Sequence, residues 1–168
     1  MIPYPRPVRD VHQIELSTRC NLKCKYCPHW PKLPRPMEDM SEDIFEASLE
    51  LVRHYVRHGT QTELSLTGIG EAMLHPLFIE MIARAREVIG PQRMLTITTN
   101  GLLLDEAMAT AIAPFHPAVF ISLHRPEKAG LAIEIAKRHG IYAGCNNSFA
   151  TSAFTWAGTQ KNWFVRAP

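Results

Sequence analysis

The stretch VHQIELSTRCNLKCKYC, residues 11–27, decides the fold, because it joins a predicted β-strand to a tight group of cysteines. Cys20, Cys24 and Cys27 follow the strand directly, at a C-x3-C-x2-C spacing. The fourth cysteine of the chain, Cys145, lies far away in the sequence. In a protein expected to occupy a reducing compartment, this distribution indicates a metal site rather than disulfide bridges.

Thiolates bind both zinc and iron–sulfur clusters, so the ligand chemistry leaves two kinds of site open. A structural zinc ion takes four protein ligands, and here His29 or Cys145 would have to complete the set. A [4Fe–4S] cube held by three cysteines instead leaves one iron without a protein ligand. An open iron on a reducible cluster can bind and activate a small molecule.

Beyond the cysteines, β-branched runs alternate with amphipathic helical runs, a pattern typical of βα units around a parallel sheet. Further strands are expected at residues 63–67, 94–98, 118–122 and 141–144. Helices are expected to follow Ser41, Pro76, Asp105 and Glu127. Repeated βα units close as a barrel or open as a doubly wound sheet, and in both folds ligands bind at the carboxyl ends of the strands.

The segments at the predicted strand ends are all polar, glycine-bearing or metal-binding. They are residues 18–27, 68–71, 99–101, 122–125 and 145–147. This coincidence predicts an active site at the carboxyl edge of the sheet.

The composition restricts the class of protein. With 168 residues, 46% of them hydrophobic and 20% charged, the chain is expected to form one globular domain with a substantial core. The formal net charge of +2 neither requires nor excludes a nucleic-acid partner. No apolar stretch approaches the roughly 18 residues of a membrane span, and the N-terminal residues lack the apolar segment of a secretory signal. A cytoplasmic protein without membrane association is therefore expected.

Four short motifs, in order and each at a strand end, together resemble the radical SAM (S-adenosylmethionine) superfamily. The cysteine motif has an aromatic residue, Tyr26, just before its last cysteine. Residues 67–76, TGIGEAMLHP, are similar to the "GGE" segment after the family's second strand. Residues 98–101, TTNG, and 121–123, ISL, resemble the third and fourth strand ends, although His124 replaces the usual acid.

This resemblance implies a partial (β/α) barrel of about five to six parallel strands. The barrel domain would span residues 1–150, and residues 151–168 would form a tail that packs on or closes it. It also implies a short form of the family, without a C-terminal domain for auxiliary clusters. The activity implied is reductive cleavage of SAM to a 5′-deoxyadenosyl radical, with an external flavodoxin- or ferredoxin-like protein as the one-electron reductant.

The resemblance assigns roles to eleven residues. Cys20, Cys24 and Cys27 would bind the [4Fe–4S] cluster, and Tyr26 would shield it and lie near the adenine. Gly68, Gly70 and Glu71 would receive the methionine ammonium, whereas Asn100, Ser122 and His124 would contact the ribose and carboxylate. Cys145 would be a hydrogen-atom donor.

Each of these assignments has a simpler structural alternative. Tyr26 would then be a packing residue, and the two glycines would only turn the chain from strand to helix. Glu71 would be an acid favoured by the dipole at a helix start, and Asn100 part of a common turn. Cys145 would be an inert core thiol, or would lie near the adenine.

The substrate is less constrained than the chemistry. The leading expectation is a peptide or protein residue, because a barrel with few strands leaves a wide lateral opening, which a partner chain or a second copy would help to close. The alternative within the enzyme class is a nucleotide or DNA base, which Trp156, Trp163 and Lys161 would stack on and neutralise. A third reading, from another class, is a non-catalytic zinc-binding module.

Overall fold

The computed structural model describes residues 10–24, 27, 36–123 and 125–146. Five parallel strands form one sheet in the order β1-β2-β3-β4-β5, so that every strand pairs with its neighbour in sequence. Their bounds are Gln13–Ile14, Glu63–Leu66, Met94–Thr99, Ala118–Ser122 and Tyr142–Asn146. This confirms the predicted α/β fold with a parallel sheet.

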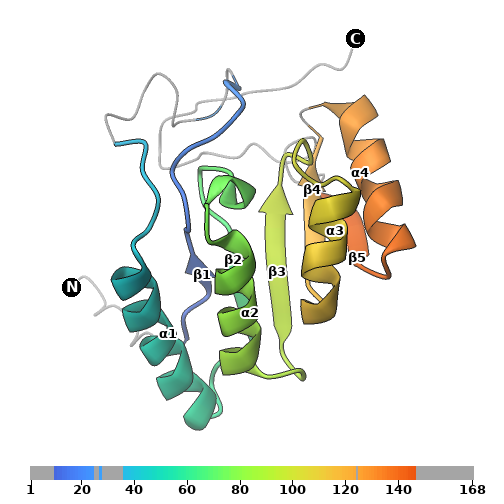
Figure 1. Cartoon of the computed structure of the whole chain (residues 1–168). Coiled ribbons are helices and arrows are strands. Elements are labelled where there is room, and N and C mark those ends of the chain that lie inside the picture. Colours follow the sequence, from blue (N-terminus) through green and yellow to red (C-terminus); the bar gives the residue numbers. More distant parts are fainter. Residues whose placement is uncertain (1–9, 25–26, 28–35, 124, 147–168) are drawn as a thin grey trace, which may run out of the picture.

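The connections between strands are helical, as parallel pairing requires. The α-helices are α1 (Glu42–Arg57), α2 (Phe78–Ile89), α3 (Glu106–Ile112) and α4 (Pro126–Arg138), with 3-10 turns η1 (Ala72–Leu74) and η2 (Ala113–Phe115). Figure 1 shows the helices on the near side of the sheet and the carboxyl ends of the strands at the top. The cysteine-bearing segment leaves β1 at that same upper edge, where the sequence places the active site.

The limits of α1 follow from local chemistry. The Ser41 side chain accepts a hydrogen bond from the Ile44 N–H, which satisfies one of the unpaired donors of the first turn. Glu42 and Asp43 follow in that turn, where the helix dipole favours acids. Gly59 has φ +71°, a conformation that glycine adopts without strain, and it lets the chain turn towards β2.

Some strand bounds differ from the sequence-based expectation by one or two residues, and β5 extends to Asn146, so that Cys145, expected just after the strand, lies within it. Two further differences concern β1 and η1. The first strand was expected over residues 11–17, but only Gln13–Ile14 (β1) pair with β2. Beyond β1 the chain pairs with a later segment instead, since Ser17 forms an antiparallel bridge with Asp39. The turn η1 was not expected. It begins where the Glu71 side chain accepts the Met73 N–H.

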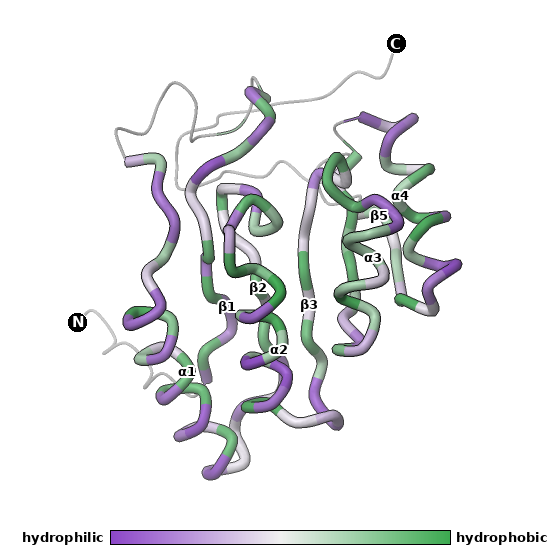
Figure 2. Tube along the Cα trace, in the orientation of Figure 1, coloured by the Kyte–Doolittle hydropathy of each residue, from purple (hydrophilic) through white to green (hydrophobic). Residues whose placement is uncertain are grey.

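The two faces of the sheet differ in polarity. On the helix side, alternate strand residues form the core: Leu64, Leu66, Leu95, Ile97, Val119 and Ile121 are buried. The residues between them, which include Ser65, Thr96, Thr98 and Phe120, face the other way and are half-buried. Figure 2 shows this alternation along β3. The strand side chains that face away from the helices are thus less deeply buried than those of the core.

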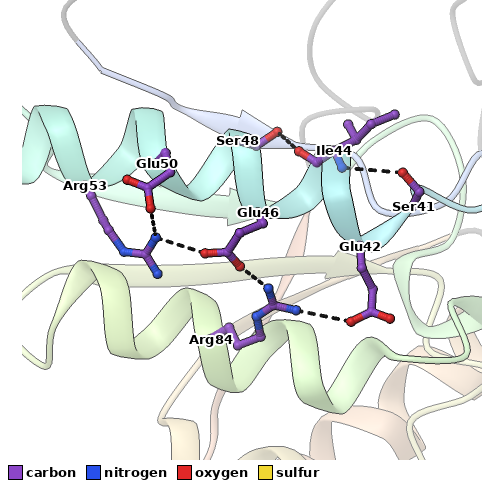
Figure 3. A network of polar contacts seen from close by, with 8 residues as sticks. All are labelled: Ser41, Glu42, Ile44, Glu46, Ser48, Glu50, Arg53 and Arg84. Carbon is purple, nitrogen blue, oxygen red and sulfur yellow. Dashed lines mark hydrogen bonds and ion pairs between the residues drawn. The ribbon is translucent and has the colours of Figure 1, made fainter.

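A network of ion pairs joins α1 to α2 on the outside of the molecule (Figure 3). Arg84 of α2 contacts Glu42 and Glu46 of α1, and Glu46 also bonds Arg53 at 2.9 Å. Arg53 in turn bonds Glu50. The hydrogen bonds from Arg53 and Arg84 lower the pKa of the Glu46 carboxyl.

No helix in the described part of the chain is long and apolar enough to cross a membrane.

Candidate functional site

The loop after β2 packs directly on the residues that precede Cys20. The Glu71 N–H donates to the Arg19 carbonyl at 2.7 Å. A Cβ atom at Gly70 would lie 2.1 Å from the Ser17 carbonyl oxygen and 2.8 Å from that of Arg19, so only glycine fits here without a shift of the backbone. Gly70 is therefore required for the contact between the two loops.

Glu15, the residue directly after β1, holds the same loop, and it was not among the residues expected from the sequence. Its Oε1 accepts the Ile69 N–H at 2.5 Å and the Gly70 N–H at 3.3 Å. A Cβ atom at Gly68 would lie 2.2 Å from the Glu15 Cγ, so the glycine leaves room for this carboxylate. These contacts favour a structural role for both glycines, and their contact with SAM stays a prediction.

Thr18 closes the base of the cysteine-bearing segment. Its hydroxyl bonds the Pro36 and Glu38 carbonyls at 2.7 and 3.1 Å. Its backbone N–H donates to the Glu38 carbonyl at 2.9 Å, and the Met40 N–H donates to the Leu16 carbonyl at 2.8 Å. The chain before Cys20 and the chain before α1 are thus joined by hydrogen bonds below the three clustered cysteines, and we call this junction the neck.

The Arg19 side chain strengthens this neck. Its guanidinium bonds Asp39 at 3.0 and 2.6 Å and donates to the Leu74 carbonyl at 2.8 Å. His75 Nε2 lies 2.9 Å from the Met40 carbonyl, and its Nδ1 accepts the Leu77 N–H, so Nε2 carries the proton. Arg19 and His75 therefore join the neck to the segment that follows Glu71.

Glu71 is the most deeply buried charged group at this edge, with 2% of its surface exposed. Its carboxylate accepts hydrogen bonds from the Thr99 hydroxyl and the Asn100 N–H, both at 2.9 Å, and from the Met73 N–H at 3.3 Å. Burial raises the pKa of the Glu71 carboxyl, and the three hydrogen bonds oppose the rise. The side chain thus cross-links the ends of β2 and β3, and the expected contact of its carboxylate with SAM receives no support from this geometry.

Asn100 extends the cross-link to the first cysteine. Its Oδ1 accepts the Leu102 N–H at 3.0 Å, which fixes the orientation of the amide. Its Nδ2 donates to Asn21 Oδ1 at 2.7 Å and lies 4.0 Å from Cys20 Sγ. Asn100 therefore contacts the metal-binding segment directly.

The three clustered cysteines are all half-buried. Burial raises the pKa of the Cys20 thiol; the Leu22 N–H opposes the rise, and Glu71, Cys24 and Cys27 add to it. Burial, and then the neighbouring Cys27, likewise raises the pKa of Cys24. A group that binds thiolates would oppose these shifts, because it stabilises the deprotonated sulfur.

Across the described ranges, no group of three or more His, Cys, Asp or Glu side chains is placed to hold a single metal ion. The three thiolates of a cube bind three different irons, so they lie farther apart than three ligands of one ion. The assignment of Cys20, Cys24 and Cys27 to a [4Fe–4S] cluster stays a prediction.

The fourth and fifth strands bring different residues to the edge. Ser122, at the end of β4, is buried, and it pairs with Asn146 of β5. Cys145 pairs with Ile121, which faces the helices, and its side chain is exposed. This register gives no support to Cys145 as a hydrogen-atom donor, which stays a prediction.

Several predicted residues lie outside the described part of the chain. They are Tyr26, His29, His124, Trp156, Lys161 and Trp163. Their assigned roles stay predictions. The sequence analysis named Gly70 but not Ser17 and Arg19, the residues whose carbonyl groups it contacts. For Arg19 the one local signal is its position directly before Cys20.

The fold and the site define an α/β protein with a parallel sheet and three cysteines at its carboxyl edge. The model of the Radical SAM superfamily matches residues 14–143, which is most of the chain. The chain belongs to the Radical SAM superfamily, whose members use a [4Fe–4S] cluster and SAM.

Two relatives give the similarity in sequence. Molybdenum cofactor biosynthesis protein 1 of Bos taurus is 37% identical over 114 residues, which cover 66% of this chain and 17% of that protein. A GTP 3′,8-cyclase of Heliobacterium modesticaldum is 29% identical over 147 residues, which cover 84% of this chain and 43% of the cyclase. The chain thus spans less than half the length of these two relatives.

Solved structures give the similarity in fold. BtrN in complex with AdoMet and 2-DOIA superposes with a TM-score of 0.64 at 17% identity, over 81% of this chain and 55% of that one. Native anSMEcpe with bound AdoMet and Cp18Cys peptide gives 0.61 at 19% identity, over 81% and 42%. The expected partial barrel is thereby confirmed at the level of fold.

The donor set fits the family's cofactor. Cys20, Cys24 and Cys27 supply three soft thiolate ligands from one segment, the number that leaves one iron of a cube open. The segment is anchored at its neck by Thr18 and Arg19.

Proposed function

We propose that this protein uses Cys20, Cys24 and Cys27 to hold a [4Fe–4S] cluster and cleaves SAM reductively in order to abstract a hydrogen atom from a substrate. The observation that carries the proposal is the placement of the C-x3-C-x2-C segment at the carboxyl edge of a parallel sheet, against the loops that end β2 and β3. When bound, the cluster and SAM supply one electron and a 5′-deoxyadenosyl radical.

The protein's own contribution is to hold the cysteine-bearing segment in place against the ends of β2 and β3. The neck closed by Thr18 and Arg19 fixes the start and the end of the cysteine-bearing segment. The Glu71 carboxylate joins the two strand ends that face it. A site built on strand ends in this way holds its groups more precisely than one on loops alone, and precision of placement determines the rate of a positioned reaction.

For the substrate, a nucleotide is the first candidate. The supporting observation is sequence similarity: the Heliobacterium relative, which aligns with 84% of this chain, is a GTP 3′,8-cyclase. A peptide or protein residue, the leading expectation from the sequence, is the second candidate. Similarity of fold to anSMEcpe, solved with bound AdoMet and Cp18Cys peptide, keeps the peptide as a candidate.

We also propose that the protein works in a reducing compartment, because the ligand thiols must stay reduced, and that an external one-electron donor reduces the cluster again after each turnover. A partner chain or a second copy that covers the polar face of the sheet belongs to the same proposal.

The experiment is anaerobic reconstitution of the 168-residue chain with iron and sulfide, followed by reduction, addition of SAM and measurement of 5′-deoxyadenosine. The wild type is expected to be brown and to release the product. The variants C20A, C24A and C27A are each expected to lose iron and product, whereas C145A keeps both.

The same assay separates the alternatives. A colourless, zinc-loaded wild type without affinity for SAM would favour the non-catalytic zinc module. Iron loss in C145A would make Cys145 a ligand. Product formation stimulated by GTP rather than by peptides would support the nucleotide, and the reverse result would support the peptide.

A further inference from the structure

Asn100 lies at the centre of a chain of hydrogen bonds that runs from a buried carboxylate to a cluster ligand. At one end, Glu71 Oε2 accepts the Asn100 backbone N–H at 2.9 Å. At the other end, Asn100 Nδ2 contacts Cys20 Sγ at 4.0 Å and Asn21 Oδ1 at 2.7 Å. The residue is 5% exposed, so water does not compete strongly for these bonds.

The orientation of the Asn100 amide is determined by its neighbours. The Leu102 N–H can only donate, so the atom that accepts it at 3.0 Å must be the oxygen, Oδ1. The nitrogen therefore faces the cysteine-bearing segment. Both polar atoms of the side chain are used within the protein, which leaves the amide poorly suited to the ribose or carboxylate contact that the family resemblance assigns to it.

The backbone at Asn100 is held as firmly as its side chain. Glu71 also accepts the Thr99 hydroxyl at 2.9 Å, and the Thr99 Oγ1 accepts the Gly101 N–H at 3.1 Å. The strand end that carries Asn100 is thus fixed on both sides of the residue. A donor fixed in this way keeps its direction when a thiol becomes a metal-bound thiolate.

We propose that Asn100 is a positioning residue for the cluster: its Nδ2–H group donates to the Cys20 thiolate, orients that ligand and raises the reduction potential of the bound cluster. Cys20 Sγ also accepts the Leu22 N–H at 3.4 Å, so two donors converge on one sulfur. Hydrogen bonds to cluster sulfurs stabilise the more negative, reduced state, and outer partners of metal ligands tune the metal in this way.

This proposal rests on the proposed function only in its requirement for a cluster on Cys20. The test uses the full chain, reconstituted anaerobically, and measures the midpoint potential of the cluster by a redox titration followed by electron paramagnetic resonance. SAM is omitted, so an effect through SAM binding does not enter. Cluster assembly in the wild type tests the proposed function, and the comparison of variants tests Asn100.

The variants are N100D and N100A, with N21A as the matched control. N100D keeps the size of the side chain and the acceptor for Leu102 but replaces the donor with a carboxylate oxygen. N100A removes the amide altogether. N21A removes the other partner of Asn100 and leaves its contact with Cys20 in place.

The expected result is a more negative midpoint potential in N100D and N100A, with iron content close to wild type. A tenfold change in the reduction equilibrium corresponds to about 59 mV for a one-electron couple, and the shift in N100D is expected to be about that size. N21A is expected to leave the potential within a small fraction of that shift.

Unchanged potentials in N100D and N100A at full iron content would overturn the proposal. An equal fall of the midpoint potential in N21A would also overturn the proposal, because the shift would then come from a change in the loop that carries Cys20 rather than from the loss of the Asn100 donor. If N100D and N100A do not retain iron, N100S keeps a short hydroxyl donor and is expected to recover iron. Failure of N100S to recover any iron would contradict the role of a donor at this position.

Discussion

Gly70 lies where two loops of the site touch, and its missing side chain is a requirement of that contact. The Ser17 carbonyl oxygen occupies the position that a Cβ atom would need, at 2.1 Å. The obstacle is backbone, which cannot rotate away as a flexible side chain can. A methyl group added at Gly70 would therefore push apart the loop after β2 and the residues that precede Cys20.

G70A is expected to destabilise the fold by about 1–3 kcal/mol, the usual cost of overpacking, and to lower iron incorporation. For a domain of this size, each kcal/mol corresponds to roughly 2–4 °C in melting temperature. Thermal unfolding and iron analysis measure the two effects.

The matched control is G130A, in the middle of α4, where a Cβ atom meets nothing within 4 Å. Alanine is favoured over glycine inside a helix by roughly 0.5–1 kcal/mol, so this variant is expected to be at least as stable as wild type. Equal melting temperatures and iron contents in G70A and G130A would show that the close approach of the Ser17 carbonyl to Gly70 does not limit the residue at this position.

Glu71 makes stability depend on pH. Burial raises the pKa of this carboxyl above its ordinary value of 4.5, so the folded state holds the proton more tightly than the unfolded state. The contribution of the protonated Glu71 to the free energy of unfolding is fully present below pH 4.5 and is lost as the pH rises through the folded pKa.

E71Q cannot ionise, so the free energy of unfolding of the wild type is expected to fall relative to that of E71Q as the pH rises. Urea unfolding of both proteins over a pH series beginning below 4.5 measures this difference. A difference that stays constant with pH would contradict the raised pKa.

At the scale of elements, the ion pairs between α1 and α2 (Figure 3) hold the helix that follows the cysteine-bearing segment. Arg84 and Glu46 are each about a third exposed, so solvent screens their interaction. The network is nevertheless the only set of ion pairs in the described ranges that joins these two helices.

A double-mutant cycle with E46A, R84A and both together is expected to give a coupling energy of about 0.5–1 kcal/mol at low salt. The coupling is expected to decrease as salt is added, because the charges lie near the surface. The coupling energy is also expected to disappear in acid. Because the pKa of Glu46 is lowered in the folded state, the ionised Glu46 stabilises the fold above pH 4.5, and this stabilisation is lost as the pH falls through the folded pKa. A coupling insensitive to salt would assign it to packing instead.

At the scale of the whole molecule, the cysteine-bearing segment lies at the carboxyl edge of the sheet, and the helices cover one face of the sheet. A group that binds only the folded chain at that edge stabilises the entire domain by mass action. The neck at Thr18 and Arg19 connects such a group to the core through β1 and η1.

Removal of the cluster by a chelator is therefore expected to lower the melting temperature of the whole domain, by the equivalent of about 2.7 kcal/mol if the group is present at a hundred times its dissociation constant. Calorimetry of the reconstituted and chelated chain measures the change, and C24A serves as a control that has no cluster to lose. An equal melting temperature before and after chelation would show that the site folds independently of its metal.

The sequence alone determined the order of βα units, the start of α1 at Ser41 and the three-cysteine segment. These features depend on local chemistry: hydrophobic periodicity, a side-chain cap, and thiols close together in the chain. β4 was predicted to the residue, and Pro117 directly before it marks its start.

Only the tertiary structure decided which polar groups meet. The Glu71 carboxylate joins residues 28 and 29 positions away, and Asn100 reaches Asn21 across 79 positions. β1 is short because Ser17 pairs with Asp39 instead of with β2, a competition that no local pattern reveals. Contacts of this range depend on the packing of the whole sheet, and for that reason the sequence predicted the residue types of the site but not their partners.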